Sequence, residues 1–210
     1  MTHNPLRWEA PPTGSPRLYG VDQSAFAQKL SAPRSPVFAE PACRKTPAAL
    51  FEGTFLIRLL PPFERNLNKR LRKAPKLYFR DAGLAHALLG IRSQRELRSH
   101  PMLGASWEGF GLEQVIRVLR LRESECFHYG VHGGDEMDLV VERGAKRYGF
   151  EFKASDSPGA TLSMHNSLRD LGLRKVFVIH TGDRSYFLND KMEAVGIRNL
   201  LQLALTWEDS

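Results

Sequence analysis

The chain has 210 residues, two cysteines and a formal net charge of +7. That length suffices for one domain with its own core plus appended segments, and an apolar content of 42% is typical of a chain that mostly folds. Cys43 and Cys126 form no metal-type pair or disulfide framework, and no apolar run resembles a membrane span or a signal peptide. We therefore expect a soluble cytoplasmic protein without a membrane partner, and the positive charge favours nucleic acid as a partner.

The first 46 residues differ in composition from the rest. Eight of the 13 prolines fall within the first 47 residues, and few apolar residues recur at a regular period. Such a stretch buries too little apolar surface to offset the entropy of ordering it. We predict that residues 1–46 are disordered or irregular, apart from a short helix around 23–30.

Residues 47–92 contain a predicted strand, a basic loop and a second predicted strand. The strands are expected at 54–60 and 76–79, and the stretch 65–80 holds seven basic and no acidic residues. This order resembles the wing of a winged helix, whose cations would contact phosphates without reading base sequence. A solvated basic loop is the equal alternative. The candidate nucleic-acid-binding residues are Lys69, Arg70, Arg72, Lys73 and Lys76.

Start and stop signals place the helices. Asp81 is a predicted N-cap of a helix through Leu89 that Gly90 ends, and a short helix or a turn is expected over 93–99. Residues 104–121 carry an apolar stripe at helical spacing. Later elements are expected as a strand from 127, a helix over 161–171 capped by Thr161, a doubly covered strand over 175–180, a strand over 186–188, and a last helix from Asn189 or Asp190 to about 204.

Polar and apolar residues alternate in two short runs, 138–142 and 147–154. Gly144 between them adopts turn geometry that branched residues resist, so we predict a β-hairpin in which Asp138 lies opposite Glu151. One hairpin face is apolar and is the predicted core face. Its members are Leu139, Val141, Tyr148, Phe150, Phe152 and Ala154.

The other predicted face of the hairpin carries the charged side chains of Asp138, Glu151 and Lys153. Asp138 and Glu151 would repel each other at directly opposed positions, so they favour a cation between them. Mg²⁺ prefers such oxygen ligands, and Lys153 on the same face would orient water or steady charge on a phosphate. The alternative is a hairpin with one solvated face, where alternating charges are ordinary.

Several motifs together resemble a known superfamily. Gly104-x-x-x-Glu108 opens a helix, Asp138 lies in a strand, and Glu151-Phe152-Lys153 lies in the next, as in the PD-(D/E)xK restriction-endonuclease-like core. Within it, the segments FEGTFLIRLLPPFERNLNKRLRKAPKLYFRDAGLAHALLGI, HPMLGASWEGFGLEQVI and DEMDLVVE…YGFEFKAS…KVFVIHTG resemble the C-terminal half of a family of prokaryotic AAA-type P-loop ATPases. In that family a winged helix and a nuclease-like domain follow the ATPase.

The resemblance implies an α/β fold with a restriction-endonuclease-like core, in which helices flank a mixed central sheet. It divides the chain into 1–46, a winged-helix remnant and linker over 47–92, and a nuclease-like domain over 93–206. No G-x-x-x-x-G-K-[ST] phosphate loop exists, so ATP hydrolysis is not assigned to this chain. We expect a truncated relative, with an ATPase supplied in trans as a possible partner.

The resemblance also implies roles for individual residues. Asp138 and Glu151 would ligate Mg²⁺ with the backbone carbonyl of Phe152, Lys153 would assist the attacking water, and Glu108 would ligate the metal directly or through water. Glu113 is the weaker candidate for the role of Glu108. The implied function is a Mg²⁺-dependent nuclease acting on DNA. The alternatives are a non-catalytic nucleic-acid-binding module and an interaction domain that regulates an ATPase.

Overall fold

The computed structural model describes residues 53–63, 74–131 and 134–207. The predictions for residues 1–46 and for four of the basic residues, Lys69, Arg70, Arg72 and Lys73, lie outside this part of the chain.

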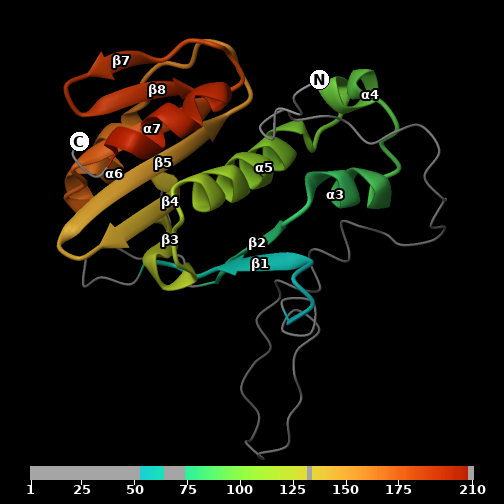
Figure 1. Cartoon of the computed structure of the whole chain (residues 1–210), viewed down its shortest axis with the longest axis horizontal. Helices are drawn as coiled ribbons and strands as arrows, with labels where there is room; N and C mark the ends of the chain where they lie inside the picture. The colour runs from blue at the N-terminus through green and yellow to red at the C-terminus, as the bar shows by residue number, and fades with distance from the viewer. Residues whose placement is uncertain (1–52, 64–73, 132–133, 208–210) are drawn as a thin grey trace, which may run out of the picture.

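A mixed six-stranded sheet forms the centre of the molecule, in the order β3-β4-β5-β6-β8-β7 (Figure 1). Strands β5, β6 and β8 are parallel, and the other neighbours are antiparallel. The predicted α/β fold with a mixed, helix-flanked sheet is confirmed. The strands are β3 (Cys126–Gly130), β4 (Glu136–Arg143), β5 (Lys146–Lys153), β6 (Lys175–His180), β7 (Tyr186–Asn189) and β8 (Met192–Gly196).

Helices cover both faces of this sheet. Helices α5 (Leu103–Val118) and α7 (Leu200–Thr206) pack on one face, and α6 (Leu162–Leu171) packs on the other. The sequence of β6 is apolar throughout because both faces of this strand are covered: Phe177 faces α5 and α7, and Val178 faces α6. The expectation of a strand covered on both sides is confirmed.

Helix α5 lies unusually close to β5. A Cβ atom at Gly111 would stand only 2.6 Å from the Phe152 ring. Glycine at this position therefore lets the helix backbone approach the strand that carries Glu151 and Lys153.

A two-stranded antiparallel sheet, β1 (Ile57–Leu60) and β2 (Lys76–Phe79), lies beside the main sheet (Figure 1). The residues after β1 bind the β3 edge: the Phe63 N–H donates to the His128 carbonyl at 2.7 Å, and the His128 N–H donates to the Pro61 carbonyl at 2.9 Å. Leu60 and Tyr78 are buried in the same core as α5. Both predicted strands are present, although the first begins at Ile57 and not at residue 54, and the winged-helix identity of this unit stays a prediction.

The helix caps predicted at Asp81 and Thr161 are present. Asp81 Oδ1 accepts from the Leu84 N–H at the start of α3 (Ala82–Leu88), and Gly90 follows it with φ +70°. Ser93 caps α4 (Gln94–Ser99), and Thr161 caps α6.

The prediction of one last helix from residue 189 to about 204 is wrong. Met192–Gly196 forms β8, and α7 begins only at Leu200 after a 3₁₀ turn. Asn189 does not cap a helix, because its Oδ1 accepts from the Lys191 N–H at 2.9 Å and closes the turn between β7 and β8. Strand β8 lies between two neighbours in the sheet, which is a non-local arrangement that the short sequence MEAVG does not reveal.

The central hairpin has the predicted register. Its pairs run from Arg143↔Lys146 to Leu139↔Phe150, and Gly144 in the turn has φ +60°. The pairing stops there, immediately before Asp138 and Glu151. The two strands therefore part at the position where the sequence places its acids.

Strand β4 also contains a β-bulge. Its pairing with β3 goes from Phe127↔Val140 to Tyr129↔Met137, so Asp138 and Leu139 together lie opposite one residue. The bulge interrupts the alternation: Leu139 packs in the α5 core, and Asp138 accepts a hydrogen bond from Lys76, which also donates to Glu108 of α5. The prediction that Asp138 shares a face with Glu151 and Lys153 is therefore wrong, as is the alternative of a solvated face, because Val140 packs in the α6 core.

Candidate functional site

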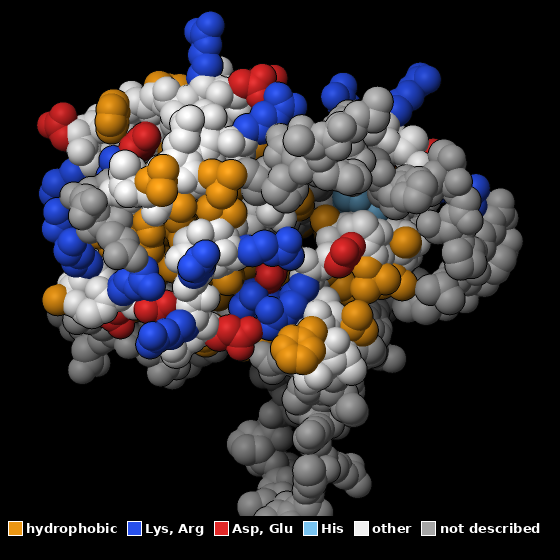
Figure 2. All heavy atoms as spheres, viewed as in Figure 1, with side chains coloured by type: hydrophobic (Ala, Val, Ile, Leu, Met, Phe, Trp, Pro, Cys, Tyr) orange, Lys and Arg blue, Asp and Glu red, His pale blue; other side chains and the backbone are white. Residues whose placement is uncertain are grey.

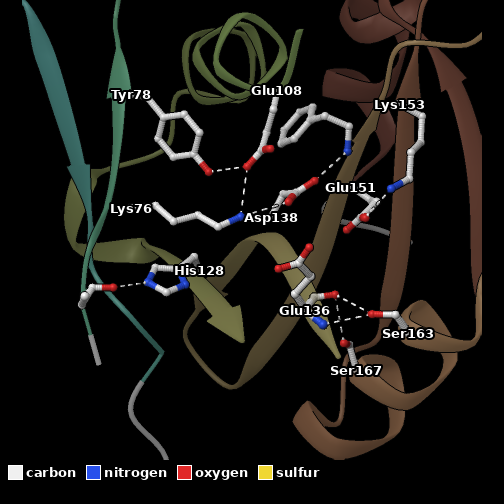
Figure 3. A network of polar contacts seen from close by, with 12 residues as sticks. Lys76, Tyr78, Glu108, His128, Glu136, Asp138, Glu151, Lys153, Ser163 and Ser167 are labelled. Carbon is white, nitrogen blue, oxygen red and sulfur yellow. Dashed lines mark hydrogen bonds and ion pairs between the residues drawn. The ribbon is translucent and has the colours of Figure 1, made fainter. Parts of the chain in front are cut away.

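Four elements contribute polar side chains to the open end of the hairpin (Figure 3). Glu108 comes from α5, Asp138 from the β4 bulge, and Glu151 and Lys153 from the end of β5. Lys76 and Tyr78 come from β2 and share one side of that strand, because they are two residues apart.

Asp138 is only 6% exposed, and both of its oxygens have partners. Oδ1 accepts from Lys76 Nζ at 3.1 Å, and Oδ2 accepts from the Phe152 backbone N–H at 3.1 Å. The bond from the Phe152 N–H replaces a backbone hydrogen bond between β4 and β5 at the position where these two strands separate. Asp138 thus joins β5 to the β2 lysine.

Glu108 shares that lysine. Its Oε1 accepts from Lys76 Nζ at 3.0 Å and from the Tyr78 hydroxyl at 2.5 Å. The predicted neighbourhood of Glu108 and Asp138 is present in the structure, with an ammonium group between the two acids (Figure 3).

Glu151 and Lys153 form the second half of the cluster. Lys153 Nζ donates to Glu151 Oε1 at 2.8 Å. Since Phe150 and Phe152 face α5, alternation along β5 directs Glu151 and Lys153 to the α6 side. Glu151 Oε2 is buried and has no hydrogen-bond partner within the described residues.

The electrostatics show an excess of acid. Burial raises the pKa of Asp138, and the charges of Glu151 and Glu108 raise it further against the opposing effect of Lys76. Burial likewise raises the pKa of Glu151, although Lys153 opposes the shift. Asp138 and Glu151 approach from different faces of the sheet, and they are nevertheless close enough to influence each other.

The pKa values of Lys76 and Asp138 are both raised, which favours the charged form of the lysine and the neutral form of the aspartic acid. Burial lowers the pKa of Lys76, but Asp138 and Glu108 outweigh burial and raise it overall. The lysine is therefore held as a cation, while Asp138 resists losing its proton. Both statements hold because, among the described residues, the carboxylates of Asp138, Glu108 and Glu151 share the ammonium groups of Lys76 and Lys153.

The donor atoms have the chemistry of a divalent-ion site, since carboxylate oxygens are what Mg²⁺ prefers and the excess of acid calls for more positive charge. The unpartnered oxygen of Glu151 is a further available donor. The described residues nevertheless contain no ready-made group of three ligands. The Lys76 ammonium stands between the two acids that would hold the ion, so the residues fit a divalent ion only when this lysine is elsewhere.

Other predicted candidates have different places. Glu113 of α5 forms a buried ion pair with Arg58 of β1, so it holds the two-stranded sheet to the helix. Phe152, predicted to offer its carbonyl, gives its N–H to Asp138. The strand end at Glu136 is fixed through its backbone, which bonds the hydroxyls of Ser163 and Ser167 (Figure 3).

Sequence reasoning missed the inward role of Lys76 and Tyr78. Lys76 was predicted as a phosphate contact within a basic run, yet its side chain is 26% exposed and engages two acids. The available signal was the two-residue spacing of Lys76 and Tyr78 on a strand, which predicts a shared direction but not what they meet.

Among the described helices, none is both long and apolar enough to cross a membrane.

Two parts of the chain match family models. Residues 46–95 match the domain of unknown function DUF8612, and residues 103–200 match the domain of unknown function DUF4143. The first region supplies Lys76 and Tyr78, and the second supplies all three acids and Lys153. The polar cluster therefore lies where the two matched regions meet.

Two curated relatives are the uncharacterized proteins Mb2031c of Mycobacterium bovis and Rv2008c of Mycobacterium tuberculosis. Each is 37% identical over 168 residues, which cover 80% of this chain and 37% of the relative. The chain thus spans less than half the length of the curated relatives it matches. No solved structure matches it significantly. Helix α5 and the six strands of the main sheet all lie within residues 103–200, the part of the chain that is similar to DUF4143.

Proposed function

We propose that this protein is a nuclease-like phosphodiesterase that acts on DNA at the open end of the β4–β5 hairpin. The observation that carries the proposal is the acid excess there: Asp138, Glu151 and Glu108 are near enough to interact and are incompletely neutralised. Buried acids with raised pKa values are typical of functional sites, although structural ion pairs also produce them.

Each residue has a role in this proposal. Asp138, Glu151 and Glu108 would hold a divalent ion, which supplies Lewis-acid stabilisation to a phosphoryl oxygen when bound. Lys153, whose side chain is 39% exposed, would orient a water molecule or donate to a phosphate oxygen. The Phe152 N–H fixes the Asp138 carboxylate, so the acid would not need to be reoriented when substrate arrives.

Surface charge is compatible with a polyanionic substrate. Figure 2 shows Lys and Arg side chains in the lower half of the visible face, with acidic side chains between them. The net charge of +7 would assist encounter with DNA.

The test is cleavage of plasmid, linear and branched DNA with Mg²⁺ or Mn²⁺. We expect cleavage by the full chain and a loss of about 100-fold or more in Asp138→Asn and Lys153→Met. Asp190→Asn, an exposed acid in the β7–β8 turn, is the matched control and should cleave normally. Equal activity in all four proteins would refute the assignment.

A non-catalytic nucleic-acid-binding module is the second candidate. The favouring observation is that Lys76 already neutralises part of the acidic cluster, as in a structural ion pair. In that case DNA binding would weaken steeply with salt and would survive Asp138→Asn. Binding that is insensitive to salt would count against it. An ATPase supplied by another chain stays a predicted partner, testable by co-purification.

A further inference from the structure

Lys76 occupies an unusual position for a residue in a basic segment. Its side chain extends from β2 into the space between α5 and β4, with Nζ 3.0 Å from Glu108 Oε1 and 3.1 Å from Asp138 Oδ1 (Figure 3). The two oxygens belong to different elements, and the ammonium group is the cation that bridges them.

Glu108 and Asp138 would hold a divalent ion in the place that the Lys76 ammonium group occupies, because carboxylate oxygens are ligands that Mg²⁺ prefers. Two cations cannot share this space, because their repulsion is strong where little water intervenes.

A second observation points to a ligand at this site. Glu151 is 6% exposed, and its Oε2 atom is buried without a partner in the described part of the chain. The lysine therefore satisfies two of the three acids and leaves the third with an unused oxygen.

We propose that Lys76 is an internal counter-ion that closes the acidic site to divalent cations until its side chain swings out. This inference rests on the proposed function and names the regulation of that same site. The two-stranded sheet can stay in place, because a buried ion pair joins Arg58 of β1 to Glu113 of α5. The Lys76 side chain can move by itself, because lysine has a flexible four-carbon stem. The exchange is therefore a rotation of one side chain.

The first test measures metal binding without nucleic acid. Mn²⁺ is titrated into the full chain, and free Mn²⁺ is followed by electron paramagnetic resonance. We expect Lys76→Met to bind Mn²⁺ at least about tenfold more tightly than the unchanged protein, because one competing positive charge is gone. Lys191→Met, which removes an exposed lysine, should show no gain, and adding Asp138→Asn to Lys76→Met should abolish the gain. A folded Lys76→Met protein with unchanged affinity would overturn the proposal.

The second test uses the unchanged protein and so does not depend on folding of a variant. Lysine acetylation rates are measured by mass spectrometry with and without millimolar Mn²⁺. We expect Mn²⁺ to increase labelling of Lys76 severalfold and to leave Lys191 unaffected. Labelling of Lys76 that does not respond to Mn²⁺ would overturn the proposal.

These outcomes separate the two proposals. Metal-dependent release of Lys76 without DNA cleavage would uphold the counter-ion and refute the nuclease. DNA cleavage without a metal-dependent change in Lys76 labelling would refute the counter-ion and uphold the nuclease.

Discussion

Glu151 shows how unevenly the cluster satisfies its members. One of its oxygens binds Lys153, and the other is buried without a hydrogen bond among the described residues. Leaving a buried acceptor unpaired costs about 1–3 kcal/mol, and burial raises the pKa of this carboxyl group. Burial therefore disfavours the ionised form of Glu151 in the folded protein, although Lys153 opposes this effect.

Neutralising Glu151 should accordingly be tolerated. We expect Glu151→Gln to leave the free energy of unfolding at pH 7.5 unchanged or higher, measured by urea denaturation. Lys153→Met removes the compensating cation and should cost about 1 kcal/mol or less, since water screens this partly exposed pair. A marked loss of stability in Glu151→Gln would show that the carboxylate is stabilising as it stands.

His180 gives the protein a pH dependence of its own. The ring is fully buried, its Nδ1 accepts from the Gly182 N–H at 3.1 Å, and burial lowers its pKa despite the nearby Asp156 charge. The unfolded chain thus binds a proton more readily than the folded one. Stability from this residue is fully present above the ordinary histidine pKa and is lost as the pH falls below it.

We expect the unfolding free energy to fall between pH 7 and pH 5, and to fall less in His180→Asn, which keeps an acceptor for the Gly182 N–H but does not titrate. Urea denaturation at several pH values measures this. The same pH slope in both proteins would assign the effect to other groups.

At the scale of elements, the close approach of α5 to β5 positions the site. Helix α5 carries Glu108, and β5 carries Glu151 and Lys153, so the separation of these elements sets the separation of the charges. Gly111 permits that approach, because a Cβ atom there would collide with the Phe152 ring at 2.6 Å.

We expect Gly111→Ala to destabilise the protein by about 1–3 kcal/mol through overpacking, as measured by thermal or urea unfolding. Gly104→Ala is a control on the same helix, since nothing lies within 4 Å of a Cβ there. It should be neutral or stabilising by up to about 1 kcal/mol. Similar losses in both variants would mean that the effect is not a clash with Phe152.

At the scale of the whole molecule, the two matched family regions share a core and a polar cluster. Leu60 and Tyr78 of the first region pack with Trp107 and Leu112 of the second, and Lys76 binds its acids. The predicted domain boundary near residue 92 therefore cuts through one continuous hydrophobic core.

A fragment covering residues 93–210 should consequently be less stable than the full chain. It would expose part of the α5 core and lose one of the two cations that compensate the acids. We expect a lower melting temperature by circular dichroism, with the full chain as the reference. A fragment as stable as the full chain would show that the first region is an independent attachment.

Local signals predicted the local features. The caps at Asp81 and Thr161 and the hairpin register depend on neighbouring residues, and the structure has them. The β8 strand, the bulge at Asp138 and the inward turn of Lys76 depend on partners far along the chain, so short-range patterns could not reveal them. The acids of the site were predicted, and the cation between them was not.

Because β4 contains a bulge, the number of residues in this strand helps to determine the position of the Asp138 side chain. One surplus residue lets Asp138 point toward α5, so deleting a single residue between Met137 and Val140 would restore even alternation and send the neighbouring side chain to the other side of the sheet. A one-codon deletion here would thus displace the carboxylate without changing its identity. Among homologues, the length of this strand is therefore as informative about the site as the acid itself.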